Sequence, residues 1–295
     1  MITIIITSYK EPRTIGKAIE LALNQKTDQN FEILISAPDK ETLNIARTYT
    51  EKNKKIKVFQ DPGKGKMYAL NLIFKKVKSD ILVLTDGDVW ISKNSIEEIA
   101  NLFSNPNVGC VAGRPVPVEN RKTMYGYWAN FLFDAAHKIR KESFKKGGFI
   151  ECSGYLFAVR NDNLKKIPLD TAEDAFIPYT FWQRGFKIGY AEKAKAYVKN
   201  VNNWGDWVKQ KVRTTKAHET LEKYVDTKKT PRAKSFKTEI NGIIDLFNYA
   251  KNLKEFYWSI LLAISRLYMW ILVLYNVKIK KFESVDNWER IESSK

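Results

Sequence analysis

Residues 81–88 read Ile-Leu-Val-Leu-Thr-Asp-Gly-Asp, a short apolar run followed at once by two aspartates that flank a glycine. An apolar run of this length predicts a buried strand, from whose end both carboxylates emerge. Carboxylate oxygens suit Mg²⁺ or Mn²⁺ held jointly with the phosphates of a substrate, which makes Asp86 and Asp88 candidate metal ligands. A simple turn is the alternative, because aspartate and glycine both favour turns.

The first half of the chain alternates β-branched apolar runs with helical patterns on both sides of this stretch. Polar residues follow the predicted strands, and open α/β sheets bind their ligands outside the carboxyl ends of strands. The alternation predicts an α/β fold with a mostly parallel sheet covered by helices. The predicted strands are 2–7, 31–36, 56–59 and 81–85, and the predicted helices are 13–24, 40–52, 66–76 and 94–103.

The pattern changes in the second half. We expect a long aromatic-rich helix from about 121, a strand at 155–159, a helix at 172–184 and a strand near 195–199. The chain then becomes helical, with helices expected at 205–224 and 235–252 on either side of a basic loop at 226–232. This organisation predicts a domain at 1–203, interface helices at 204–254, and an apolar helix with a basic tail at 255–295.

Charge and cysteine content narrow the environment. The formal net charge of +17 points to an anionic partner such as a nucleotide, a phospholipid surface or nucleic acid, and does not choose among them. Cys110 and Cys152 lie in apolar surroundings, which favours two buried thiols over a disulfide or a metal cluster. Met1 leads directly into an apolar run, so we expect no secretory signal and a cytosolic location for the bulk of the chain.

A second acidic pair, Glu173-Asp174, precedes an amphipathic helical run. Thr171 is expected to cap that helix. Acidic residues in a first helical turn are stabilising without any catalytic role, so helix capping by itself accounts for the pair.

Residues 63–71 contain Lys64 and Lys66 at the start of a predicted helix. Backbone amides and ammonium groups at such a position bind phosphate. The segment lacks the spacing of a Walker A loop, so the sequence does not predict a phosphate site of the Walker A type there.

Gln210 and Arg213 stand three residues apart, on one face of a predicted helix that begins near Trp204 and Trp207. This pairing is compatible with a binding role. A solvated basic helix accounts for it equally well.

In this order and at this spacing, the motifs resemble family 2 glycosyltransferases with the GT-A fold, the group that includes cellulose, chitin and hyaluronan synthases and dolichol-phosphate sugar synthases. The resemblance covers about residues 1–215. It implies a Rossmann-like mixed sheet flanked by helices, followed by a helical membrane-associated region. It also implies a nucleotide-diphosphate sugar as donor and Mg²⁺ or Mn²⁺ as cofactor.

The resemblance assigns the donor contacts. Residues 7–11, Thr-Ser-Tyr-Lys-Glu, match the family's first nucleotide-contacting loop, although Lys10 replaces the usual asparagine. Residues 36–39, Ser-Ala-Pro-Asp, are a degenerate form of the family's next loop, so its uracil-contacting aspartate is either displaced to Asp39 or absent. Residues 65–71 match a family segment whose lysine approaches the donor. The implied donor contacts are Ser8, Tyr9, Glu11, Asp39, Lys66 and Asp86.

The resemblance also assigns the chemistry. Asp86-Gly87-Asp88 matches the metal-binding DxD motif, with metal contact chiefly through Asp88 and metal or ribose contact through Asp86. Glu173-Asp174 matches the family's ED pair, in which the aspartate, here Asp174, is the catalytic general base. Thr214 stands where the QxxRW motif of processive members has tryptophan, so single transfer and polymerisation both stay open. The implied acceptor or diphosphate contacts are Glu173, Gln210 and Arg213.

The implied function is inverting transfer of a hexosyl or N-acetylhexosaminyl group to a lipid-linked or glycan acceptor, at the cytoplasmic face of the cell membrane. Such an enzyme needs no nucleic-acid partner. A sugar nucleotidyltransferase is one alternative, for which a glycine-rich loop would be expected near the first strand. A basic membrane- or nucleic-acid-binding protein without catalysis is the other, and it leaves the ordered acidic pairs unexplained.

The most apolar stretch, residues 256–277, has the roughly 20-residue length that spans a bilayer. Arg266 near its middle costs about 2.5–3.5 kcal/mol on insertion scales. Lysines precede and follow the stretch, at positions 251, 254, 278, 280 and 281, so docking on an anionic membrane surface fits as well as spanning. Burial against the rest of the chain is a third alternative.

Overall fold

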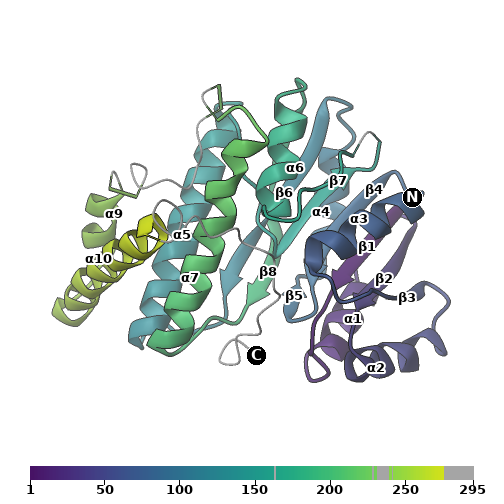
Figure 1. The fold of residues 1–295 in the computed structure, drawn as a ribbon, viewed down its shortest axis with the longest axis horizontal. Coiled ribbons are helices and arrows are strands. Elements are labelled where there is room, and N and C mark those ends of the chain that lie inside the picture. The colour runs from purple at the N-terminus through teal and green to yellow at the C-terminus, as the bar shows by residue number, and fades with distance from the viewer. Residues whose placement is uncertain (163, 228, 231–238, 241, 276–295) are drawn as a thin grey trace.

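The computed structural model describes residues 1–162, 164–227, 229–230, 239–240 and 242–275 (Figure 1). These residues form an eight-stranded sheet in the order β3-β2-β1-β4-β7-β6-β8-β5. The basic tail at 276–295 and residues 228, 231 and 232 of the predicted basic loop at 226–232 lie outside the described residues.

The N-terminal half of the sheet is parallel. β1 pairs with β2 and β4 on its two sides, and β2 pairs with β3. The isoleucine-rich β1 is buried along its whole length, as a strand covered on both faces requires. Each element starts and ends within two residues of its predicted bounds. The strands are β1 (Ile2–Thr7), β2 (Phe31–Ala37), β3 (Ile56–Gln60) and β4 (Ile81–Asp86), and the helices are α1 (Ile15–Leu23), α2 (Lys40–Thr50), α3 (Lys66–Lys76) and α4 (Ser95–Leu102).

The other half of the sheet makes it mixed. β7 (Leu156–Arg160) runs antiparallel to both β4 and β6, whereas β8 (Lys187–Val198) runs parallel to β6 (Val108–Pro117). The short β5 (Val89–Ile91) closes the edge, antiparallel to β8. β5 and β6 were not expected from the sequence, because β6 contains two glycines and two prolines, which weaken a strand pattern.

Helices cover the sheet and extend beyond it. α6 (Glu173–Trp182) follows the predicted bounds closely, and the predicted helix at 205–224 is α7 (Trp204–Glu219) followed by the 3₁₀ turn η1 (Thr220–Lys223). The predicted helix at 235–252 contributes α9 (Ile243–Asn248), while 235–238 and 241 lie outside the described residues. α5 (Met124–Lys145) and α10 (Leu253–Leu274) are the two longest of the described helices.

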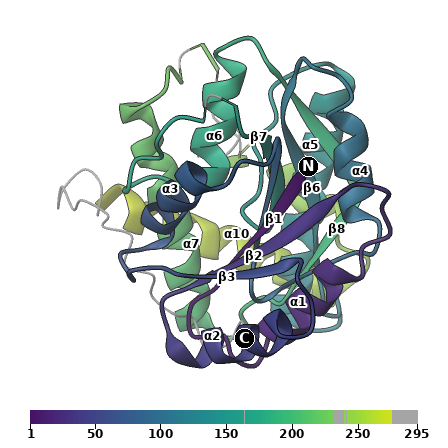
Figure 2. The ribbon, with the colours of Figure 1, turned by 90° about the vertical axis from the view of Figure 1, so that its right-hand side faces the viewer.

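The described apolar core has three parts. Two clusters are centred on the sheet, one including Ile4 and Ile33 and the other including Ile5 and Leu82. The third is formed by α5, α7, α9 and α10, with Trp128 and Met269 among its buried members. Figures 1 and 2 show this helical layer on the side of the sheet away from α1 and α2.

One face of α10 packs against the helical layer. Its buried residues recur every three or four positions and end at Met269, Trp270 and Val273. The opposite face is apolar and exposed, with Leu253 88% and Ile264 59% accessible. α10 is long and apolar enough to cross a membrane, by length and composition. In the described residues it lies alongside α5 and α7, as expected for a helix buried on one face.

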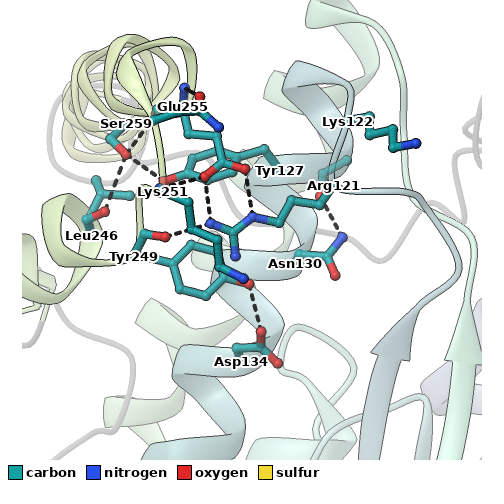
Figure 3. Close-up of polar contacts among 12 residues, drawn as sticks. Arg121, Lys122, Tyr127, Asn130, Asp134, Leu246, Tyr249, Lys251, Glu255 and Ser259 are labelled. Carbon is teal, nitrogen blue, oxygen red and sulfur yellow. Dashed lines mark hydrogen bonds and ion pairs between the residues drawn. The ribbon is translucent and has the colours of Figure 1, made fainter.

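Polar contacts fix the start of α10 to α5 (Figure 3). The Arg121 guanidinium donates from Nε to Glu255 Oε1 at 2.7 Å and from Nη2 to Glu255 Oε2 at 2.7 Å. The same Nη2 donates to the carbonyl of Tyr249 at 2.6 Å, and the hydroxyl groups of Tyr127 and Ser259 lie 2.7 Å apart. A bidentate, charge-assisted pair of this kind fixes orientation as well as distance.

Candidate active site

Parallel pairing brings the polar strand ends together. Thr7 is in register with Asp86 of β4 and with Ser36 of β2. The Thr7 hydroxyl donates to Asp86 Oδ1 at 2.8 Å, so the end of β1 holds the first carboxylate of the DxD motif. The first loop and the DxD motif are therefore neighbours, as expected for polar residues that follow adjacent parallel strands.

The first loop packs tightly behind Gly87. The Ser8 hydroxyl donates to Glu11 Oε2 at 2.7 Å, and the Glu11 amide donates to the Thr42 hydroxyl at 2.9 Å. The Gly87 amide donates to the Thr7 carbonyl at 2.9 Å. A Cβ atom on Gly87 would overlap the Ser8 hydroxyl and lie 2.6 Å from Glu11 Oε2. The DxD glycine is thus required by close packing.

Asp39 stabilises the neighbouring backbone. It is the N-cap of α2, where Oδ1 accepts from the Thr42 amide at 2.9 Å and Oδ2 accepts from the Lys10 amide at 2.7 Å. Burial raises its pKa, but these hydrogen bonds outweigh burial and lower it below 3.8. Lys10 adopts a left-handed backbone conformation, with φ of 54°. Asparagine, usual at this position in the family that the sequence resembles, adopts that conformation more readily than lysine.

Asp61, at the end of β3, was missed by the sequence analysis. Its carboxylate is 3% exposed and accepts from the Ser36 hydroxyl at 3.1 Å and from the Gly63 amide at 2.9 Å. Burial raises its pKa above 3.8. The available signal was its position directly after a strand, which is also the position of Asp86 after β4.

Lys66 joins the two acidic motifs. From the first residue of α3, its ammonium lies 2.7 Å from Asp86 Oδ1 and 2.7 Å from Glu173 Oε1. Burial lowers the pKa of Lys66, and the two carboxylates more than reverse that effect, so the side chain is a permanent cation. The pKa of Glu173 is raised, because its burial outweighs the attraction of Lys66. The site therefore contains a fixed positive charge beside the DxD motif.

Asp174 lies in the first turn of α6, where Oδ2 accepts from the Gly154 amide at 2.8 Å. The expectation that Thr171 caps this helix was wrong. Ala172 occupies the N-cap position and no side chain caps it, because the helix begins one residue too late for the Thr171 hydroxyl. Neither acidic residue is explained as a cap, since Glu173 pairs with Lys66 and Asp174 binds a separate loop.

Tyr155 is the second residue that the sequence analysis missed. Burial raises the pKa of its phenol strongly, and the nearby carboxylates of Asp88, Asp86 and Asp174 raise it further, while Arg213 opposes them. Its ring stacks on Phe133 of α5, with centroids 6.0 Å apart. The side chain thus lies within electrostatic range of the DxD motif, Asp174 and Arg213.

The remaining predicted positions are partly or fully accessible to solvent. Gln210 is half-buried on α7, and Arg213 is exposed one turn further along. Tyr9 and Asp88 are half-buried. Within the described residues, no three carboxylate, histidine or cysteine side chains converge into a complete metal site. Cys110 and Cys152 are buried free thiols, as predicted.

The profile of the family described as glycosyl transferase family 2 matches residues 3–167, which is more than half of the chain. The protein therefore belongs to glycosyltransferase family 2. The family resemblance and the GT-A fold predicted from the sequence are confirmed.

Relatives with assigned activities match this chain at moderate identity. The O-antigen chain rhamnosyltransferase WbaN of Salmonella anatum is 28% identical over 213 residues, which cover 68% of this chain and 66% of the relative. An N-acetylglucosaminyltransferase of Azorhizobium caulinodans is 24% identical over 186 residues, which cover 57% of this chain and 46% of the relative. The chain thus spans less than two thirds of the length of these two relatives.

Solved structures show the same fold. The mannosyltransferase PcManGT from Pyrobaculum calidifontis, in complex with GDP-Man and Mn²⁺, superposes with a TM-score of 0.61 at 15% identity, covering 97% of this chain and 82% of that one. Residues 1–349 of S. aureus TarS, in complex with UDP-GlcNAc, give a TM-score of 0.52 at 14% identity, covering 84% and 80%. At these identities the likeness establishes the fold alone.

Proposed function

We propose that the protein transfers a sugar, with inversion at the anomeric carbon, from a nucleotide-diphosphate donor to an acceptor hydroxyl. The observation that carries this proposal is the meeting of both acidic motifs at Lys66. The Lys66 ammonium lies 2.7 Å from Asp86 and 2.7 Å from Glu173, and Asp174, next to Glu173 in the chain, accepts a hydrogen bond from the Gly154 amide. The site thus has one group suited to a leaving diphosphate and another suited to a nucleophile.

The residues present fit a divalent cation. Asp86 and Asp88 supply hard oxygen donors, and the described residues add no third protein ligand, which suits Mg²⁺ or Mn²⁺ completed by water and substrate phosphates. When bound, the ion supplies charge neutralisation at the departing diphosphate. Lys66 and Arg213 provide further positive charge from the protein, where negative charge develops.

Asp174 acts as the general base. It takes the proton from the acceptor hydroxyl while that oxygen forms a bond to the anomeric carbon. The bond from the anomeric carbon to the donor phosphate oxygen breaks, and its electron pair leaves with the diphosphate. The Gly154 hydrogen bond to Oδ2 fixes the position of the carboxylate.

The nucleoside is proposed to lie over the ends of β1, β2 and β3. Tyr9 belongs to the first loop there, and Asp39 accepts a hydrogen bond from the Lys10 amide of the same loop. The carboxylate of Asp61 is close enough to Asp39 for their charges to interact. Ser8 and Glu11 support the loop through their mutual hydrogen bond. Asp61 therefore joins the residues proposed from the sequence as a donor contact.

The acceptor is proposed to be lipid-linked or a glycan of the cell envelope, used at the cytoplasmic face of the membrane. The exposed apolar face of α10, the net charge of +17 and the O-antigen activity named for WbaN support this setting. The donor panel therefore includes a nucleotide-activated rhamnose as well as hexoses and N-acetylhexosamines.

The decisive experiment measures release of nucleoside diphosphate from this donor panel with Mn²⁺, Mg²⁺ or chelator, in detergent. Wild type is compared with Asp88→Ala and Asp174→Asn. Metal-dependent release that both variants lose would support the proposal and identify the donor. A wild-type protein that neither binds nor cleaves any sugar nucleotide would refute it.

A further inference from the structure

A large cavity lies between α5, α7 and α10, with α9 at its rim. Its volume is about 1100 Å³. Pockets for organic ligands usually measure about 300–1,000 Å³. A cavity of this size is suited to a substantial ligand.

Apolar side chains from opposite helices form much of its wall. They include Phe133 and Ala136 of α5, Ile243 of α9 and Leu267 of α10. The hydroxyl groups of a free sugar would find few hydrogen-bond partners against such side chains, which makes binding of a sugar there costly. The wall instead matches a hydrocarbon chain.

Two kinds of residue line the cavity. Tyr155 and Gln210 belong to the proposed transfer site. Ile264 and Leu267 belong to α10 and are 59% and 52% exposed. The same space is therefore lined by residues of the proposed transfer site and by exposed apolar residues of α10.

Two ion pairs lie among the charged groups in the wall. The Arg266 guanidinium donates from Nε to Glu239 Oε2 at 2.8 Å and forms an ion pair with that carboxylate. Lys138 and Asp245 pair at 3.3 Å. The Arg121–Glu255 contacts of Figure 3 hold α10 in place beside α5, so that the two walls keep their separation.

We propose that the acceptor is an amphiphile whose long apolar chain occupies this cavity. The chain passes Ile264 and Leu267, and the head group that carries the acceptor hydroxyl lies at Tyr155 and Gln210, beside Asp174. This assignment rests on the proposed transferase function and specifies its acceptor class. It requires an apolar path, a polar reacting end and an opening on an apolar surface, and all three occur in one cavity.

The test uses a photoreactive long-chain alkyl phosphate as probe, with cross-linked peptides identified by mass spectrometry on the full chain. Ala263→Trp and Ala136→Trp narrow the cavity from α10 and from α5. Ile260→Trp is the matched control, because Ile260 is exposed on α10 and does not line the cavity. We expect labelling of the wall residues on α5 and α10 to fall about tenfold or more in Ala263→Trp and Ala136→Trp. A tenfold fall corresponds to about 1.4 kcal/mol of binding free energy. Labelling should persist in the Ile260→Trp control.

A parallel assay compares transfer to dodecyl glycosides with transfer to methyl glycosides of the same sugars. Ala263→Trp should lose the preference for the dodecyl acceptor while it retains nucleoside diphosphate release to water. Wild-type labelling in both narrowed variants, or labelling confined to outward residues such as Tyr257, would overturn the acceptor assignment. Labelling of the cavity without nucleoside diphosphate release from any donor would overturn the transferase function instead.

Discussion

The carboxylate of Asp174 accepts a 2.8 Å hydrogen bond from the backbone amide of Gly154. This contact joins the first turn of α6 to the segment that leads into β7, where Tyr155 is located. Because the donor is a backbone group, the position of Asp174 depends on the path of that segment and not on the side chain at residue 154. Asp174, the proposed base, and the phenol of Tyr155 are therefore positioned together.

Asp174→Asn should remove the proton acceptor while an amide oxygen still accepts from Gly154. We expect turnover to fall by about 10²- to 10⁴-fold, the usual contribution of a general base, with donor affinity unchanged. Nucleoside diphosphate release and calorimetric titration of the donor measure the two quantities. Turnover at the wild-type level would mean that another group takes the proton.

Gly87→Ala should disrupt the first loop, because the new Cβ overlaps the Ser8 hydroxyl and crowds Glu11. Overpacking of this kind costs about 1–3 kcal/mol, and we expect it as lost donor affinity together with a lower melting temperature. Gly154→Ala is the matched control, since its Cβ meets nothing closer than Glu173 Oε1 at 3.4 Å. Equal donor affinity in both variants would contradict the packing argument.

Glu255→Gln should destabilise the junction of α5 and α10 in a pH-dependent way. Hydrogen bonds from Arg121 hold the pKa of Glu255 below its ordinary value of 4.5, so the pair stabilises the fold above pH 4.5 and loses that effect as the pH falls through the lower pKa of the folded state. At pH 7 we expect the free energy of unfolding of the variant to be about 1.5–3 kcal/mol lower than that of the wild type.

Urea denaturation of wild type and Glu255→Gln across the acid range measures this difference. The difference in free energy of unfolding between the two proteins should decrease below pH 4.5. A difference of the same size at every pH would show that the carboxylate charge does not contribute to stability.

Lys10→Asn should stabilise the protein. Lys10 has a φ of 54°, and L-residues other than asparagine, aspartate and glycine pay about 1–2 kcal/mol for that conformation. We expect a gain of about 0.5–1 kcal/mol in the free energy of unfolding. Lys54→Asn, at another exposed loop lysine, is the control and should leave stability unchanged. A gain in neither variant, or in both, would contradict the backbone explanation.

The parallel half of the fold could be predicted because its strands are uninterrupted β-branched runs with polar residues directly after them. β6 could not, since its glycines and prolines serve close packing that depends on partners far along the chain. A Cβ on Gly113, for instance, would lie 2.8 Å from the Leu156 side chain. Local propensity is a weak guide where tertiary contacts decide the structure.

The same distinction applies to the site. Asp86, Asp88, Glu173 and Asp174 belong to short motifs, whereas Tyr155 enters the site only because β7 pairs antiparallel with β4. The link from Lys66 to Glu173 likewise depends on where α3 and α6 meet, which spacing does not reveal. For α10 the sequence left three alternatives open. In the structure α10 has one buried face and one exposed face. The length and hydropathy of a segment do not predict such an arrangement.

The two-sided packing of α10 bears on how this enzyme can be handled and altered. Leu262, Met269, Trp270 and Val273 complete a core that also contains Tyr127 and Trp128 of α5. Truncation before residue 253 would therefore leave those aromatic side chains facing solvent, and would yield an aggregating fragment in place of a soluble catalytic domain. Helix α10 is consequently part of the folded core and cannot be removed as a separate segment. A shorter version of this transferase would need a redesigned α5 before it could dispense with α10.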